Sequence, residues 1–272
     1  FDIDKTNGRI VTNGSLDREK VSVFTLTITA YDGAVIEKRR STNATVIITL
    51  LDVNDNTPYF AEYPAHYIVP ENTRIGETAA IIDVRDPDAG ENGALNFTML
   101  SCDLCGYFIL NSTTGAFITN KSLELENSTT LLPYTNFTFN IHVADRGTPQ
   151  PRAITGIVIL TVIPTNEYAP VFTRTNLSLT LAENTKVGHL VVKVLATDRD
   201  IDRHGIVDYY IESGNFRKTF SIAKTNGEII LMQPLDYETY SSYKLVITAQ
   251  NGQDYKKATK MTVHITVTDI PD

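Results

Sequence analysis

The sequence predicts an all-β chain made of tandem β-sandwich units. Landmarks recur at a fixed spacing, apolar residues alternate with a period of two, and no stretch of the 272 residues keeps a helical period. Units of roughly 110 residues with about seven short alternating strands are typical of an immunoglobulin-like, Greek-key sandwich. We therefore expect seven-stranded sandwiches joined end to end.

The repeat spacing divides the chain. Glu71 recurs as Glu183, and Asp86 recurs as Asp198, each 112 residues later. A half sandwich lacks about three strands and leaves sheet edges open, so we expect the first segment not to fold alone. The spacing predicts three segments: the C-terminal half of a repeat in 1–56, a complete repeat in 57–168, and a complete repeat without its exit linker in 169–272.

Alternation marks the inner face of the predicted strands. Phe137, Phe139, Ile141 and Val143 lie at every second position, which places them on one face of an extended strand. The other segments show the same pattern in Phe24/Leu26/Ile28/Ala30, Leu245/Ile247/Ala249, Val46/Ile48/Leu50, Val158/Leu160/Val162 and Val263/Ile265/Val267.

Composition excludes several classes of function. The net charge of −8 and the pI of about 5.2, without a basic stripe, exclude nucleic acid as a partner. Mean hydropathy is −0.11, and no apolar run reaches the ~18 residues of a membrane span. We expect no enzyme and no small-molecule substrate, because the sequence contains no phosphate loop, nucleophile motif or histidine pair. Clustered carboxylates could form the acid pair of a glycosidase, but a catalytic site has no reason to recur in every unit.

Two features indicate an extracellular location. Asn-x-Ser/Thr sequons, the acceptors of N-glycans, are numerous. The two cysteines are Cys102 and Cys105, and a disulfide that closes this short loop is favoured over free thiols. Redox or metal chemistry at a C-x-x-C motif would need a βαβ setting, which the strand pattern of this sequence lacks. The sequons lie at Asn13, Asn43, Asn96, Asn111, Asn120, Asn127, Asn136 and Asn176.

Acidic motifs recur in phase where strands end and loops gather. Packed carboxylates repel one another near neutral pH unless a cation is present. The motifs contain oxygen donors and no thiol or imidazole, which argues against zinc, and a high number of oxygen ligands favours Ca²⁺ over Mg²⁺. The sequence therefore predicts calcium at the segment junctions.

These motifs resemble those of the cadherin superfamily over the whole chain. The four segments that carry the resemblance are the linker Asp52-Val53-Asn54-Asp55-Asn56, Leu16-Asp17-Arg18-Glu19, Asp86-Pro87-Asp88-Ala89-Gly90-Glu91-Asn92-Gly93 and Val143-Ala144-Asp145-Arg146-Gly147. The loops look more like those of protocadherins or large Fat-, Dachsous- or tip-link-type cadherins than those of other members. The resemblance implies extracellular cadherin repeats with three Ca²⁺ ions at each junction.

The resemblance assigns ligands to the first junction. The family's first acidic ligand would precede residue 1, so two of the three ions should lose a ligand there. The implied side-chain ligands are Asp17, Glu19, Asn54, Asp55, Asp86, Asp88 and Asp145, with backbone oxygens from Val53, Asn56 and Asn92.

The second junction departs from the family pattern. Asn251 stands where the turn aspartate should be, so the third ion would lose one negative ligand, and Asp202 is a nearby carboxylate that could replace it. The implied ligands are Glu71, Glu124, Glu126, Asn166, Glu167, Asp198, Asp200 and Asn251 by side chain, and Thr165, Tyr168 and His204 by backbone. Half of a further junction, with weak or no calcium, is expected from Glu183, Asp236, Glu238 and Asp272.

The implied function is calcium-dependent cell adhesion or tethering. The chain would be part of the ectodomain of a single-pass membrane protein, whose membrane span lies outside it. Its partners would be other cadherin ectodomains, bound homophilically or heterophilically. Two alternatives remain: a calcium-dependent module that binds glycans or matrix, and a passive spacer.

Overall fold

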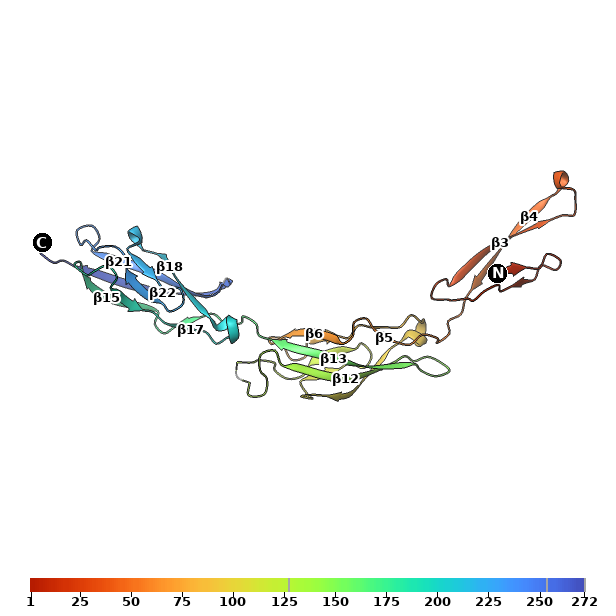
Figure 1. Cartoon of the computed structure of the whole chain (residues 1–272), viewed down its shortest axis with the longest axis horizontal. Helices are drawn as coiled ribbons and strands as arrows, with labels where there is room; N and C mark the ends of the chain where they lie inside the picture. Colours follow the sequence, from red (N-terminus) through yellow and green to blue (C-terminus); the bar gives the residue numbers. More distant parts are fainter. Residues whose placement is uncertain (127, 253, 272) are drawn as a thin grey trace. The chain divides into compact units, whose positions relative to one another are not determined.

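The structure, a computed structural model, describes residues 1–126, 128–252 and 254–271 and consists almost entirely of β-strands (Figure 1). The predicted all-β class is confirmed. The strands of residues 1–60 are β1 (Asp2–Ile3), β2 (Ile10–Val11), β3 (Val23–Tyr31), β4 (Ser41–Thr49) and β5 (Tyr59–Phe60). They are followed by β6 (Ala65–Pro70), β7 (Thr78–Ile81), β8 (Val84–Arg85), β9 (Asn96–Cys102), β10 (Phe108–Leu110), β11 (Ala116–Thr119), β12 (Asn136–Ala144) and β13 (Ala153–Ile163).

The remaining strands lie after residue 170. They are β14 (Val171–Phe172), β15 (Asn176–Ala182), β16 (Leu190–Lys193), β17 (Ala196–Thr197), β18 (Val207–Ser213), β19 (Phe220–Ile222), β20 (Glu228–Leu231), β21 (Ser242–Asn251) and β22 (Asp254–Thr268). Short 3-10 turns interrupt the loops at η1 (Ile36–Lys38), η2 (Gly90–Gly93), η3 (Asp202–Gly205) and η4 (Phe216–Lys218).

Backbone contacts divide the chain into two compact units. Unit 1 contains residues 1–67, 78–118 and 137–159, and unit 2 contains residues 68–77, 119–136 and 160–272. The predicted ligands of the first junction all lie in unit 1, and those of the second junction all lie in unit 2. The repeat boundaries inferred from the sequence stay a prediction.

Residues 1–56 form two antiparallel hairpins. Strand β1 pairs with β2, and β3 pairs with β4 so that Val23 lies opposite Thr49. Phe24, Leu26 and Ile28 of β3 are half-buried and alternate with exposed threonines, whereas Ala30, predicted on the same face, is exposed near the strand end. The Phe1 ring packs edge-on against Phe24, with 5.1 Å between centroids. The alternation expected for this strand is therefore present, with partial burial.

A three-stranded sheet, β10-β11-β7, and a four-stranded sheet, β6-β13-β12-β9, make up the middle of the chain. Figure 1 shows β12 and β13 running side by side. The burial of β12 alternates along its length, and Phe137 and Phe139 point inward against Phe108 and Phe117. The predicted inner face of this strand is confirmed, because the apolar residues at every second position are the buried ones.

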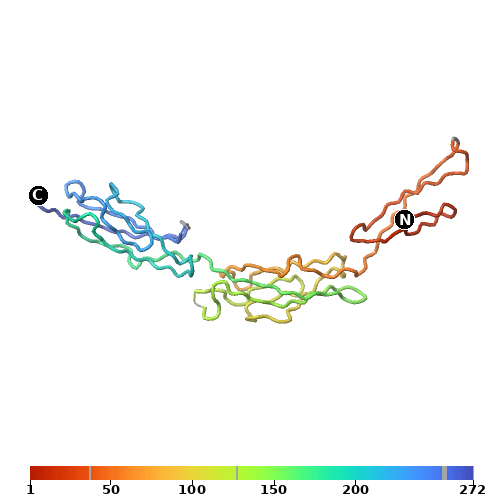
Figure 2. Tube along the Cα trace, viewed as in Figure 1, coloured from red at the N-terminus to blue at the C-terminus, as the bar shows by residue number. Residues whose placement is uncertain are grey.

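Unit 2 contains the second pair of sheets, in the orders β15-β22-β21-β18 and β16-β20-β19. Both sheets lie in residues 160–272, whose trace runs from green to blue in Figure 2. Strand β15 is parallel to β22, whereas β21 is antiparallel to β22, which is the mixed pairing of a Greek-key sandwich. Leu245, Ile247, Val263 and Ile265 form a fully buried core that both sheets share with Ile229.

Candidate metal centres at the segment junctions

The linker between β4 and β5 brings Asn54 into the first junction. Asn54 is 6% exposed, and its Nδ2 donates to Asp145 Oδ1 at 3.2 Å and to the Gln150 carbonyl at 3.1 Å. Asn54 Oδ1 is buried and has no hydrogen-bond partner within the described residues. The linker amide and the turn aspartate after β12, 91 residues apart, are thus in direct contact.

The loop after β8 carries the paired aspartates of the first junction. The buried Asp88 accepts hydrogen bonds from the Asn56 backbone N at 3.1 Å and from Asn56 Nδ2 at 2.6 Å. Asp86 Oδ1 accepts from the Asp88 backbone N, while the buried Asp86 Oδ2 finds no partner in the described part of the chain. Burial and then the charges of Asp88, Asp145 and Asp52 raise the pKa of Asp86.

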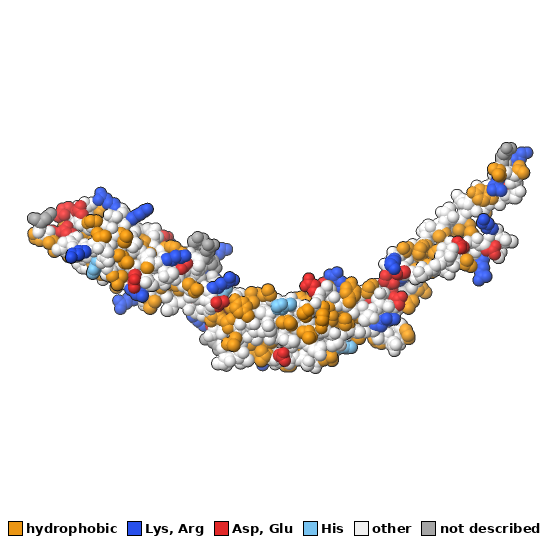
Figure 3. Space-filling model, viewed as in Figure 1, with side chains coloured by type: hydrophobic (Ala, Val, Ile, Leu, Met, Phe, Trp, Pro, Cys, Tyr) orange, Lys and Arg blue, Asp and Glu red, His pale blue; other side chains and the backbone are white. Residues whose placement is uncertain are grey.

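Three carboxylates from three segments meet at this junction. Oxygen atoms of Glu19, Asp52 and Asp88 lie within 4.8 Å of one another. Figure 3 shows acidic and basic side chains gathered side by side where residues 1–56 meet the next segment. Asp52 is absent from the ligands inferred from the sequence, although it is the first acid of the linker motif and could have been found there.

Other predicted ligands of the first junction have different surroundings. Asp17 pairs with Lys20 Nζ at 2.6 Å, and this hydrogen bond lowers the pKa of Asp17. Asp55 is exposed, and its backbone N donates to the Val53 carbonyl at 2.8 Å. The side chain of Asn92, expected to contribute only its backbone, donates from Nδ2 to Asp52 Oδ2 at 2.8 Å.

Glu71 holds together two segments of the second junction. Its side chain is almost fully buried, at 1% exposure, and accepts from the backbone N of Leu125 at 2.9 Å and of Thr165 at 2.7 Å. Burial, with smaller contributions from the charges of Glu126 and Glu167, raises the pKa of Glu71 above its ordinary value. Burial and the neighbouring negative charges thus both disfavour the ionised form of this carboxylate.

Asp200 receives the linker of the second junction. The backbone N of Glu167 and the backbone N of Tyr168 both donate to its carboxylate, with shortest distances of 3.1 Å and 3.0 Å. Asp198 Oδ1 accepts from the Asp200 backbone N at 2.8 Å, while the buried Asp198 Oδ2 has no hydrogen-bond partner among the residues described. Burial raises the pKa of Asp200, as it does for Asp86 in the first junction.

The loop after β11 carries two further acidic side chains predicted as ligands of this junction. Glu126 is half-buried, its Oε1 has no partner in the described ranges, and burial raises its pKa. Glu124 is exposed. Asn166 is half-buried, and Thr165 Oγ1 donates to Glu167 Oε1 at 3.0 Å.

Asn251 takes the place of the turn aspartate at the second junction. It is 4% exposed, and its Nδ2 donates to the His204 carbonyl at 2.7 Å. Asn251 Oδ1 is buried and unpartnered within the described chain. Asp202, the sequence neighbour that could supply the lost charge, accepts instead from the Tyr134 hydroxyl at 3.1 Å.

The loop that carries Asp86 and Asp88 and the loop that carries Asp198 and Asp200 each contain a glycine in close contact with the backbone. A Cβ added to Gly93 would lie 2.1 Å from the Asp88 carbonyl oxygen, and one added to Gly205 would lie 2.1 Å from that of Asp200. The two glycines are 112 residues apart, which is the repeat spacing. Close backbone approach therefore requires glycine in both loops.

The acids of the last segment are more open than those of the junctions. Glu183 accepts from the backbone N of Tyr237 at 3.1 Å and of Ile270 at 2.6 Å, and these bonds lower its pKa. The exposed Asp236 accepts from Thr239, and Glu238 is also exposed. Asp272 lies outside the described residues.

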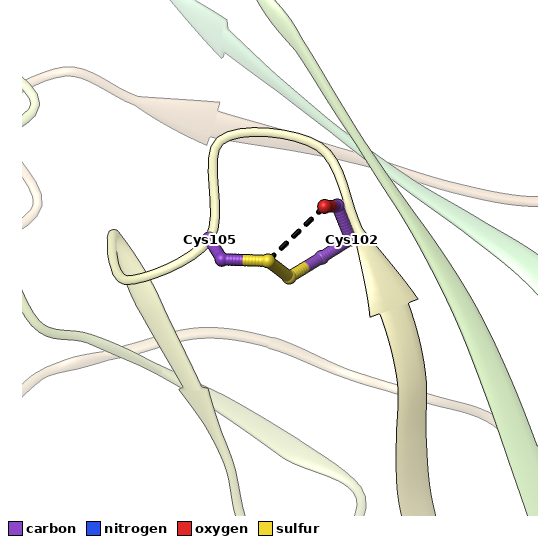
Figure 4. The surroundings of a disulfide bond; sticks show 2 residues. All are labelled: Cys102 and Cys105. Atoms are coloured by element: carbon purple, nitrogen blue, oxygen red, sulfur yellow. Dashed lines mark hydrogen bonds between the residues drawn. A yellow bond between two sulfur atoms is a disulfide. The ribbon is translucent and has the colours of Figure 1, made fainter.

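The disulfide and the glycosylation sequons, which indicated an extracellular location, can be located in the structure. Cys102 and Cys105 are joined by a disulfide in the loop after β9, and Cys105 Sγ lies 3.0 Å from the Cys102 carbonyl oxygen (Figure 4). Asn127 lies outside the described residues. The exposed sequon asparagines are Asn13, Asn43, Asn96, Asn111, Asn120, Asn136 and Asn176.

The donor set at both junctions fits a hard divalent cation. Buried polar groups are normally paired, so unpaired buried oxygens indicate a missing partner. The donors are carboxylate, amide and carbonyl oxygens, which are the ligands that Ca²⁺ prefers. Within the described residues, the buried oxygens without a hydrogen-bond partner include Asn54 Oδ1, Asp86 Oδ2, Glu126 Oε1, Asp198 Oδ2 and Asn251 Oδ1.

Comparison with known proteins identifies relatives of the whole chain. The family model described as cadherin domain matches residues 1–51, 65–163 and 177–268. Human Protocadherin Fat 1 is 33% identical over 273 residues, covering 100% of this chain and 6% of that protein. Human Cadherin-23 is 32% identical over 278 residues, covering 100% of this chain and 8% of that protein. The expected resemblance to protocadherins and large Fat-type cadherins is confirmed by these relatives.

Solved structures share the fold. A structure of Protocadherin Gamma B2 extracellular cadherin domains 3-6 aligns with a TM-score of 0.60 and 23% identity, covering 95% of this chain and 63% of that one. The human Desmocollin-1 ectodomain aligns with a TM-score of 0.57 and 24% identity, covering 99% and 52%. Among the described residues, no helix is long and apolar enough to cross a membrane.

Proposed function

Because this chain belongs to the cadherin family, we propose that it is a segment of an extracellular adhesion protein whose repeats are held in line by Ca²⁺. The observation that supports this most directly is the set of buried oxygens at both junctions that have no hydrogen-bond partner within the part of the chain that the structure describes. Backbone N–H groups around them, such as those of Asn56 and Glu167, are hydrogen-bonded. The unsatisfied buried atoms include side-chain oxygens, which are the ligands that Ca²⁺ prefers.

The ligands come from both sides of each junction. In the first, Glu19 and Asp52 belong to the upstream segment and its linker, and Asp86, Asp88 and Asp145 belong to the downstream one. When bound, Ca²⁺ supplies the positive charge that these mutually repelling carboxylates share. Residues on either side of the linker are then fixed to one centre, and bending at the linker costs the binding energy of the ion.

The location and partners follow from the same proposal. The chain would lie outside the cell in the ectodomain of a membrane-anchored protein, and it would contact other cadherin ectodomains. Its role would be adhesive or mechanical, not enzymatic. The exposed sequons and the disulfide support an oxidising, extracellular environment.

A second candidate function is calcium-dependent glycan binding. Phe216 is 52% exposed and stacks on Tyr240, with ring centroids 5.4 Å apart. Tyr240 and Asp236, one of the predicted acidic ligands, line the same pocket. An exposed aromatic platform beside an acidic cluster is what such a module would need, and binding to a glycan array in Ca²⁺ but not in chelator would favour it.

Calcium titration by calorimetry tests the main proposal. The wild-type chain should bind several ions with dissociation constants of roughly 10⁻⁵ to 10⁻³ M, which extends from the weakest sensor sites to extracellular modules. Asp88→Asn should weaken binding at the first junction, and Asp200→Asn should do the same at the second. As a control, Asp83→Asn removes an exposed carboxylate paired with Arg85 and should leave the titration unchanged. Absence of calcium-dependent heat in the wild type would contradict the proposal.

A further inference from the structure

Arg18 lies inside the acidic cluster of the first junction. Its Nε is 2.6 Å from Asp52 Oδ1, and its Nη2 is 2.5 Å from Glu19 Oε1. Nη2 also donates to the Pro87 carbonyl at 3.1 Å. The Arg18 side chain is only 20% exposed. One guanidinium therefore contacts the upstream segment, the linker and the downstream aspartate loop.

The cluster that Arg18 enters carries three negative charges. Glu19 and Asp52, its two ion-pair partners, are two of the three carboxylates within 4.8 Å of one another, and Asp88 is the third. A cation in this position lowers the repulsion among them. The same carboxylates are the ones that would hold Ca²⁺, so the two cations need the same oxygens.

Only the first junction has a basic residue at this position. The corresponding residue is Leu125 at the second junction and Tyr237 in the last segment, spaced from Arg18 by the repeat pattern of the L-D-R-E motif. Leu125 is buried in the core, and its backbone N donates to Glu71. The guanidinium is therefore a particular feature of one junction and is not required by the fold.

Resting on the proposed calcium function, we propose that Arg18 is a built-in counter-cation that competes with Ca²⁺ at the first junction. In calcium its guanidinium gives up Glu19 and Asp52. Without calcium it neutralises the cluster and ties the upstream segment to the downstream loop through the Pro87 carbonyl. The first junction then has weaker calcium affinity than its acids alone would give, and it keeps part of its alignment when calcium is low.

A simple positioning role would have the opposite effect. If Arg18 only held Glu19 and Asp52 in place for the ion, its removal would loosen the ligands and weaken calcium binding. If Arg18 competes, its removal leaves the cluster more negative and strengthens binding. The sign of the change in affinity therefore separates the two roles.

The test is calcium calorimetry on the full chain with Arg18→Met, which keeps the aliphatic stem and removes the charge. We expect one ion to bind about threefold to tenfold more tightly, as affinity follows ligand charge. Arg18→Lys keeps the charge and should titrate like the wild type. Arg85→Met is the matched control, because Arg85 pairs with Asp83 at 2.8 Å outside the cluster.

A second measurement reports on the metal-free junction. Spin labels at Thr27 on β3 and Thr98 on β9, both exposed, give the distance between the two segments of this junction. In chelator, Arg18→Met should broaden the distance distribution relative to wild type and Arg18→Lys. In saturating calcium the distributions should coincide.

The outcomes separate this inference from the function on which it rests. A wild type that binds no calcium overturns both. A wild type that binds calcium, with Arg18→Met binding it equally or more weakly, overturns the competition and leaves the calcium function standing. If Arg18→Met unfolds, Arg18→Gln is titrated in its place. Tighter calcium binding by that variant supports the competition, and equal or weaker binding overturns it.

Discussion

Asn251 stands where the first junction has Asp145. Asp145 accepts hydrogen bonds from Asn54, Gly147 and Arg152, whereas Asn251 donates to the His204 carbonyl and leaves its Oδ1 unpartnered within the described residues. The amide brings no charge to the site, and its N–H occupies a carbonyl oxygen predicted to be a ligand. The third calcium site of the second junction should therefore be the weaker of the two third sites.

Asn251→Asp tests this comparison. The added charge should tighten one ion at the second junction, because calcium affinity rises with ligand charge. In chelator the variant should instead be less stable by about 1–3 kcal/mol, since the His204 carbonyl loses its donor and a buried charge is unpaired. Calorimetry gives the first result and chemical unfolding gives the second.

Asp202→Ala is the control for Asn251→Asp. Asp202 accepts from the Tyr134 hydroxyl, so its removal should leave the ion count unchanged. Loss of an ion in Asp202→Ala, with no gain in Asn251→Asp, would show that the charge comes from Asp202.

Part of the candidate site could be predicted from residue types and repeat phase. These assigned Asn54 and Asp145 to one junction and Glu167 and Asp200 to the other, and each pair is hydrogen-bonded in the structure. They did not indicate Asp52 or the place of Arg18, because a motif gives spacing along the chain and not which side chain faces the cluster. The metal roles of the ligands stay predictions.

At the scale of elements, the aspartate loops depend on close backbone packing. Gly93 has the Asp88 carbonyl oxygen where a Cβ would stand, at 2.1 Å, and backbone atoms cannot move aside as a flexible side chain can. Any larger residue must displace the loop that carries Asp86 and Asp88. The glycine thus supports the conformation of the loop that carries the two aspartates.

Gly93→Ala should therefore destabilise the chain by about 1–3 kcal/mol and weaken calcium binding at the first junction more than tenfold. Differential scanning calorimetry and calcium titration measure the two effects. Gly33→Ala is the control, since nothing lies within 4 Å of its added Cβ. Equal behaviour of the two variants would show that the loop adapts.

Long strands were predictable and short elements were not. Period-two alternation identified β12, β13, β21 and β22 because each spans enough residues for the pattern to repeat. The two-residue strands such as β5 and β8, and turns such as η3, carry no periodicity. Their positions depend on tertiary contacts, for example between Phe60 and Val84.

At the scale of the whole molecule, the proposed calcium function predicts that protons and calcium compete for the same carboxylates. Burial raises the pKa of Glu126 above its ordinary value of 4.5. A raised pKa means that the folded state prefers the protonated form, so this contribution to stability is complete below the unfolded-state pKa and is lost as pH rises through the folded-state pKa. Without calcium, the ionised group therefore destabilises the fold at neutral pH.

Glu126→Gln isolates this effect. In chelator the variant should be more stable than wild type at about pH 7.5, and the difference should disappear by about pH 4. In calcium at neutral pH the order should reverse, because the variant lacks a negative ligand. Chemical unfolding in these three conditions measures both differences in stability. A variant that is less stable than wild type in chelator at neutral pH would contradict the assignment.

Small-angle X-ray scattering of the full chain tests most directly whether calcium holds neighbouring repeats in line. In about 1 mM Ca²⁺, the concentration range to which extracellular modules respond, we predict a particle with a larger maximum dimension, or a narrower distribution of dimensions, than in chelator. Asp88→Asn combined with Asp200→Asn should scatter in calcium as the wild type does in chelator. Identical wild-type profiles with calcium and with chelator would contradict the claim.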